Sequence, residues 1–139
     1  MKKVNIFFDV DGTLRDNSKG YQVADSDGAE PNHDIVALLR ILAKFKNVNI
    51  YIWSGGGATY AEEVARIFGV DKLVKGYASK NLIKYSSECR LSPQCPKYVV
   101  DGNCNHPKLK FEPDVKPDIA IDDIQACDMG AFNLIVKQK

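Results

Sequence analysis

The sequence predicts an α/β protein built on a central parallel sheet of about five strands. Short apolar runs alternate along the chain with segments of helical periodicity, an order that is typical of parallel strands joined by helices. Several of these runs end in clustered Asp, Ser or Gly residues, which is where ligands bind in such sheets. These two observations favour a sandwich of three layers, with helices on both faces of the sheet.

The first predicted strand and the first predicted helix follow one another in the N-terminal third of the chain. Val4 to Val10 is a short apolar run, which we interpret as a buried strand. Residues 34–46 place apolar side chains at positions i, i+3, i+4, i+7 and i+10, the last of them Phe45. This spacing predicts an amphipathic helix with one apolar face.

The middle of the chain predicts a second strand and helix, followed by a weaker third strand. Val48 to Trp53 is the second apolar run. The helix after it should open near Thr59, because Glu62 three positions later completes the signature of a capping box. We expect this helix to end at Gly69 and the third strand to cover residues 73–79.

Two further strands are predicted at residues 118–121 and 132–137. Residues 81–117 interrupt the alternation, since they are rich in Pro, Cys, Lys and Asn and show no clear periodicity. We interpret them as a small insertion in a single Rossmann-like domain that spans residues 1–139.

The composition excludes several classes of protein. Apolar residues make up 45% of the chain and charged residues 27%, and the net charge of +1 offers no basic field for nucleic acid. No apolar run approaches the roughly 20 residues of a membrane span. The run after Met1 stops at Asp9, too early to serve as a signal peptide. We therefore expect a cytoplasmic protein without a membrane or nucleic-acid partner.

Acidic residues follow two predicted strands that are far apart in the sequence. Asp9 and Asp11 follow the first strand, and Asp122 and Asp123 follow the strand at 118–121. Because parallel strands end at one edge of a sheet, folding should gather the four carboxylates, and Mg²⁺ suits such hard oxygen ligands. The alternative, an acidic turn, explains an isolated Asp-x-Asp-Gly but not the matching pair on a second strand.

The segments "DVDGT", "WSGGG" and "IAIDD", each at the end of a predicted strand, resemble motifs one, two and four of the haloacid dehalogenase (HAD) superfamily of phosphohydrolases. The resemblance implies a HAD-like fold and Mg²⁺-dependent hydrolysis of a phosphomonoester through an aspartyl-phosphate. It implies that Asp9 is the nucleophile and Asp11 the general acid and base. Mg²⁺ would be held by Asp9, the main chain of Val10 or Asp11, and Asp123, with Asp122 beside them.

The same resemblance assigns residues that bind the phosphoryl group of the substrate. Ser54 would donate a hydrogen bond to it, and Gly55 and Gly56 would bring main-chain N–H groups close. The family also requires a lysine, for which we favour Lys80 at the end of the third strand. Lys116 is the alternative, although six residues of strand, roughly 20 Å, separate it from the acidic pair at 122–123.

The predicted insertion contains a second possible metal site. Cys89, Cys95, Cys104 and His106 follow the spacing C-x5-C-x8-C-x-H and supply enough ligands for tetrahedral Zn²⁺. Some HAD phosphatases carry a zinc loop in a similar place, with closer cysteine pairs. The alternative is a set of scattered, partly buried thiols, which the lack of any C-x-x-C pair favours.

Two other functions fit the resemblance. The chain could transfer a phosphoryl group to an acceptor other than water, or it could be a catalytically idle module that binds phosphate or a partner. Residues 15–33 are long enough for a flap but too short for the cap domain of larger HAD enzymes. We therefore expect an open pocket, which would suit a bulky phosphorylated substrate or a second protomer that lends its own surface.

Overall fold

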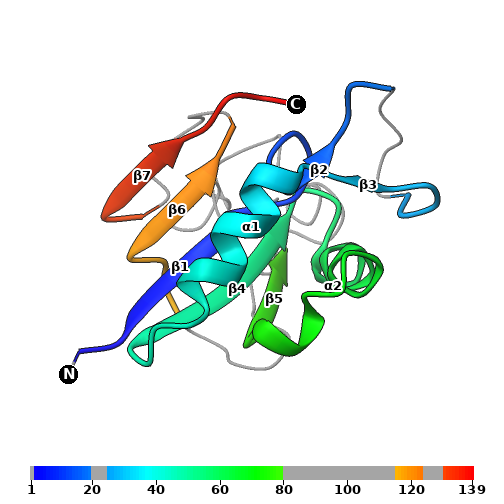
Figure 1. Ribbon diagram of the computed structural model, residues 1–139. Coiled ribbons are helices and arrows are strands. Elements are labelled where there is room, and N and C mark those ends of the chain that lie inside the picture. The colour runs from blue at the N-terminus through cyan, green and yellow to red at the C-terminus, as the bar shows by residue number, and fades with distance from the viewer. Residues whose placement is uncertain (1, 20–24, 80–114, 124–129) are drawn as a thin grey trace, which may run out of the picture.

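The computed structural model describes residues 2–19, 25–79, 115–123 and 130–139. Its centre is a sheet of five parallel strands in the order β5-β4-β1-β6-β7 (Figure 1). The strands are β1 (Val4–Asp9), β4 (Val48–Ser54), β5 (Gly76–Ser79), β6 (Ile119–Asp122) and β7 (Phe132–Ile135). The predicted parallel sheet is confirmed, and the fold is α/β and Rossmann-like.

The order of the strands places the ends of β1 and β6 at a switch point of the sheet. From β1 the chain moves outward to β4 and then β5, and it later returns to place β6 on the other side of β1. In open α/β sheets, ligands bind beyond the carboxyl ends of the strands at such a point. The register pairs Phe8 with Ile121, so the last residues of both strands reach the same edge.

The two described helices, α1 (His33–Leu42) and α2 (Ala58–Ile67), contribute to the core on one face of the sheet. Figure 1 shows α1 lying in front of β1 and β4. Alternate strand residues such as Phe8 and Ile52 point into this core, where they meet Leu39 of α1 and Val64 of α2. No helix in the described part of the chain covers the other face, so the predicted third layer stays a prediction.

Aromatic side chains fill the opposite face of the sheet. Phe7 stacks on Tyr51 with ring centroids 4.8 Å apart, and it meets Trp53 at 4.7 Å with the rings tilted. All three are buried, together with Ala78 and Ala120. Apolar residues on both faces explain why these strands read in the sequence as continuous apolar runs rather than alternating ones.

The boundaries of both helices differ from those predicted. α1 ends at Leu42, so Phe45 lies outside it and is 55% exposed instead of completing the apolar face. The predicted capping box of α2 is wrong, because Gly57 is the N-cap and no side chain caps the helix. Gly57 has a φ of 105°, a backbone conformation that other residues rarely adopt. Because the N-cap is Gly57, the helix begins at Ala58, before Thr59.

A short antiparallel ribbon follows β1 in the region expected to form a flap. It pairs β2 (Arg15–Asp16) with β3 (Glu30–Pro31). A 3-10 turn, η1 (Asp71–Leu73), precedes β5, which therefore begins later than predicted. None of the described helices is long and apolar enough to cross a membrane.

Candidate active site

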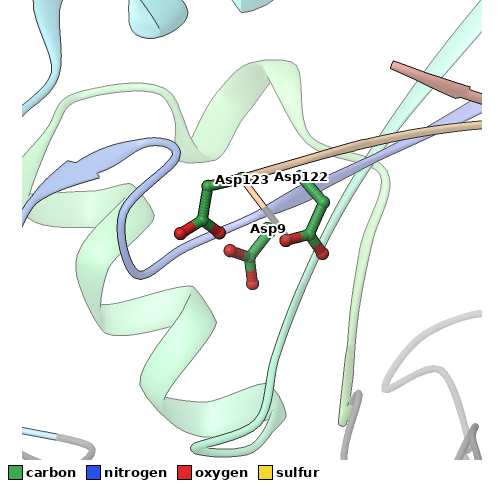
Figure 2. Close-up of side chains that lie close together, drawn as sticks. All are labelled: Asp9, Asp122 and Asp123. Atoms are coloured by element: carbon green, nitrogen blue, oxygen red, sulfur yellow. The ribbon is translucent and has the colours of Figure 1, made fainter. Parts of the chain in front are cut away.

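Three carboxylates meet where β1 and β6 end. Asp9 is the last residue of β1 and Asp122 the last of β6, and Asp123 follows directly. One carboxylate oxygen from each residue lies within 4.8 Å of the other two, and the three side chains lie side by side in Figure 2. We call these three residues the acidic cluster. The expected gathering of carboxylates from the two ends of the chain is therefore present.

The acidic cluster is largely withdrawn from solvent. Asp9 is 6% exposed and Asp122 is fully buried, while Asp123 is partly exposed. Burial, and then the hydrogen bond and the negative charge of Asp122, raise the pKa of Asp123 above its ordinary value. Adjacent negative charges in such a setting repel one another, and a bound cation would remove that cost.

The spacing of the acidic cluster suits a small divalent ion. At Mg–O distances of about 2.1 Å, neighbouring oxygens of an octahedral site lie about 3 Å apart and opposite ones about 4.2 Å apart. Oxygens already within 4.8 Å of one another reach these separations through small side-chain movements. The donor set fits Mg²⁺ and other hard divalent cations.

The turn after β1 is shaped around the acidic cluster. Gly12 has a φ of 77°, and a Cβ at this position would overlap Oδ2 of Asp123, so only glycine fits. The hydroxyl of Thr13 is 3.1 Å from Oδ2 of Asp9, to which it donates, and 3.3 Å from Oδ1 of Asp123. Both residues lie within the segment "DVDGT", in which only the two aspartates were predicted to have a role.

The side chain of Asp11 does not join the acidic cluster, which corrects its predicted place among the carboxylates around the metal. Its Oδ1 instead accepts hydrogen bonds from the hydroxyl of Tyr60 at 2.7 Å and from Nδ2 of Asn17 at 3.1 Å. Asp9 and Asp11 would share a side if the strand continued. The chain turns directly after Asp9, so their side chains separate.

Ser54 lies at the same edge of the sheet, at the end of the strand beside β1. Asp9 pairs with Trp53 in the register, which places Ser54 at the carboxyl end of β4. Its buried Oγ accepts a hydrogen bond from the N–H of Gly56 at 2.9 Å. Gly55 and Gly56 are exposed in the turn that leads into α2, as expected of residues that approach a ligand.

The remaining predicted site residues are either distant or outside the described residues. Lys116 is exposed and precedes the first residue of β6, so it lies at the amino end of the strand, opposite the acidic cluster. This position argues against its role in substrate binding. Lys80 and the predicted zinc ligands lie outside the described residues, and those assignments stay predictions: Cys89, Cys95, Cys104 and His106.

The group that holds Asp11 was not predicted from the sequence. Nη1 of Arg15 donates to the hydroxyl of Tyr60, which donates in turn to Asp11. Arg15 lies in the flap and Tyr60 in α2, and no local pattern connects positions so far apart in sequence. Arg15 lies in the predicted flap and Tyr60 in a predicted helix, and a single Arg or Tyr in such a segment is too common to be a specific signal.

Comparison of the chain with protein-family models, with curated proteins and with solved structures finds no match in any of the three. The fold and the site define the class: an α/β protein with a buried cluster of three aspartates at the switch point of a parallel sheet. Such a cluster is suited to a divalent cation.

Proposed function

We propose that this protein is a Mg²⁺-dependent phosphatase of the HAD type, which hydrolyses a phosphomonoester through an aspartyl-phosphate on Asp9. The observation that carries the proposal is the division of the acidic residues into two groups. Three carboxylates form the acidic cluster, and Asp11 is held apart from it by Tyr60 and Asn17. Covalent phosphoryl transfer needs this division, because the nucleophile must be ionised near a metal while a separate carboxyl exchanges protons.

In this mechanism the acidic cluster would hold Mg²⁺, which would offset the charge of the phosphate as a carboxylate approaches it. A carboxylate oxygen of Asp9 attacks phosphorus, and the bond from phosphorus to the leaving oxygen breaks. Asp11 gives its proton to that oxygen. Asp11 then takes a proton from the attacking water, the bond from Asp9 to phosphorus breaks, and free phosphate leaves. Ser54 and the N–H of Gly55 would bind the phosphoryl oxygens.

Several finer features belong to the same proposal. A three-layer HAD-like arrangement would add helices on the aromatic face of the sheet, as the resemblance implies. Lys80 would balance the charge of the phosphoryl group, and the protein would act on a phosphorylated substrate in the cytoplasm. The short flap of β2 and β3 supports an open pocket, because a ribbon of this size covers little of a substrate.

Replacement of the nucleophile tests the proposal. Wild-type protein should hydrolyse p-nitrophenyl phosphate with Mg²⁺ and lose this activity in EDTA, and Asp9→Asn should abolish it without unfolding the protein. Asp34→Asn, which removes an exposed carboxylate from α1, should be fully active. Mass spectrometry of acid-quenched protein should find one added phosphoryl group in the wild type and none in Asp9→Asn. Normal turnover by Asp9→Asn would refute the nucleophile assignment.

A substrate panel distinguishes the alternatives. It should contain 5′- and 3′-nucleotides, sugar phosphates and phosphorylated polynucleotide ends, because an open pocket excludes none of them. Release of free phosphate supports hydrolysis, whereas transfer to an added alcohol in preference to water would favour a phosphotransferase. Binding of phosphorylated compounds without turnover would favour the idle binding module.

A further inference from the structure

A chain of hydrogen bonds connects the flap to Asp11 through α2. Nη1 of Arg15 donates to the main-chain carbonyl of Asp25 at 2.6 Å and to the hydroxyl of Tyr60 at 2.7 Å. The hydroxyl of Tyr60 then donates to Oδ1 of Asp11 at 2.7 Å. Asn17 donates to the same oxygen from the flap side.

The direction of this chain is fixed by the chemistry of its members. A guanidinium has donors only, so the oxygen of Tyr60 must accept from Arg15. The phenol has one hydrogen, which leaves Asp11 as its only acceptor among the described residues. Burial, and then the hydrogen bond to Asp11, raise the pKa of Tyr60 far above neutrality, so the hydroxyl keeps its proton.

Burial of a guanidinium and a phenol hydroxyl costs free energy, so this chain of hydrogen bonds is not incidental packing. Arg15 is 5% exposed and Tyr60 is 3% exposed, and Arg is almost never buried unless it is paired. Tyr60 is also the one tyrosine of α2, and its ring lies in the main core, so the position of its hydroxyl is set by the packing of the helix. A rigid element therefore presents a single donor to Asp11.

Oδ1 of Asp11 receives two hydrogen bonds, and in the described part of the chain no group donates to Oδ2. We propose that Tyr60, oriented by Arg15, is a positioning residue that holds Asp11 so that Oδ2 exchanges the proton with the substrate. The proposal rests on the phosphatase function above and adds a part to its acid–base machinery. Tyr60 acts through Asp11 and need not touch the substrate.

The proposal predicts a selective defect in the protonation of the leaving group. A general acid matters most when the departing oxygen is strongly basic, as in an alkyl phosphate, and least for p-nitrophenyl phosphate. We expect Tyr60→Phe to lower kcat/KM about 30-fold for an alkyl phosphate, less than the roughly 100- to 10,000-fold that a whole general acid supplies, because Asp11 itself remains. For p-nitrophenyl phosphate we expect a loss of less than about 5-fold, because the acid contributes little there.

The assay measures kcat/KM for a series of aryl and alkyl phosphates and plots its logarithm against the pKa of the leaving group. This parameter covers only the steps through the first bond cleavage, so the later role of Asp11 as a base does not affect it. Tyr60→Phe should give a steeper negative slope than the wild type. Asp11→Asn should give the steepest slope and sets the limit for complete loss of the acid.

Two further variants keep the result interpretable. Tyr77→Phe also removes a buried phenol hydroxyl from the core, but Tyr77 makes no hydrogen bond to Asp11, so its slope should match the wild type. Asn17→Ala removes the other donor to Oδ1 from a partly exposed position, and it should steepen the slope less than Tyr60→Phe. If Tyr60→Phe fails to fold, Arg15→Met provides the test, because it removes the donor that orients the hydroxyl of Tyr60 and should also steepen the slope.

The outcomes separate this inference from the proposed function. An equal loss for all leaving groups, or no loss, would overturn the role of Tyr60 while Asp9-dependent hydrolysis by the wild type leaves the phosphatase intact. Absence of any Asp9-dependent hydrolysis would remove the phosphatase, and the positioning role with it. A steeper slope in Tyr60→Phe alongside an unchanged slope in Tyr77→Phe supports the inference.

Discussion

Replacement of Asp123 by asparagine should change the stability of the protein in opposite directions with and without Mg²⁺. The substitution removes one of the three charges of the acidic cluster and keeps an oxygen that can accept from Thr13. Two unit charges 4.8 Å apart repel by about 3.5 kcal/mol at an effective dielectric constant of about 20. Solvent, salt and partial protonation of Asp123 reduce this repulsion, so we expect a gain of about 1–2 kcal/mol without metal.

With Mg²⁺ bound, the wild type should be more stable than Asp123→Asn. A ligand at 100 times its dissociation constant stabilises the folded state by about 2.7 kcal/mol, and wild-type protein should show a gain of this order. Asp123→Asn loses a charged ligand and should gain much less. Thermal unfolding in EDTA and in saturating Mg²⁺ measures both effects, at about 4 °C for each kcal/mol in a chain of this size. Asp34→Asn removes an exposed carboxylate that is not part of the acidic cluster and should respond to Mg²⁺ as the wild type does.

The pH dependence gives a separate check. The pKa of Asp123 is raised in the folded protein, so the folded state binds the proton more tightly than the unfolded state does. Asp123 therefore contributes its full stabilisation below pH 3.8, its ordinary pKa. This stabilisation is lost as the pH rises through the higher pKa that Asp123 has in the folded protein. The gain from Asp123→Asn should be larger at pH 8 than at pH 4. A variant that is less stable than the wild type in EDTA, or equally stabilised by Mg²⁺, would refute the reasoning.

Two other substitutions test the turn after β1, both by urea unfolding. Gly12→Ala should lower the free energy of unfolding by about 2–4 kcal/mol and weaken stabilisation by Mg²⁺, because it combines a strained φ with a clash on Asp123. Gly28 has a similar φ, but a Cβ there would meet no other atom, so Gly28→Ala is the control. If it lowered the free energy of unfolding as much as Gly12→Ala does, the clash with Asp123 would not be the cause. Thr13→Val should cost about 1–3 kcal/mol in EDTA, since it removes a donor to buried carboxylates. The exposed control Thr59→Val should barely change the free energy of unfolding. Equal stability of Thr13→Val and Thr59→Val would exclude a role for Thr13 in holding Asp9 and Asp123.

The sheet was predictable because its strands are short apolar runs with abrupt polar ends. Five runs were expected and five parallel strands form, with boundaries that differ by up to three residues. The ends of helices were less predictable, since a helix start depends on backbone conformation. Thr59 and Glu62 match a capping pattern, but the positive φ of Gly57 already begins the helix before them.

The acidic cluster was predictable for a topological reason, and the place of Asp11 was not. Parallel strands end at one edge of the sheet, and the carboxylates after β1 and β6 meet there because these two strands are neighbours. The separation of Asp11 from Asp9 depends on a turn whose direction is set by Gly12 and by contacts distant in sequence. Those contacts, from Tyr60 and Arg15, follow from the tertiary fold and leave no periodic signal.

The turn after β1 is held on several sides, which suits the two roles proposed for its residues, metal binding and proton transfer. The N–H of Lys139 donates to the carbonyl of Gly12 at 3.0 Å, and the N–H of Asn17 donates to the carbonyl of Lys139 at 2.9 Å. The N–H of Gly12 also donates to Oδ1 of Asn17. The carbonyl of Val10, which lies between Asp9 and Asp11, accepts from the N–H groups of Thr13 and Arg15, so the backbone of the turn is restrained on both sides of Asp11. Restraint of this kind keeps Asp9 and Asp11 apart without a rigid strand between them. A substitution that releases the turn should therefore affect metal binding and proton transfer together, whereas Tyr60→Phe should affect proton transfer alone.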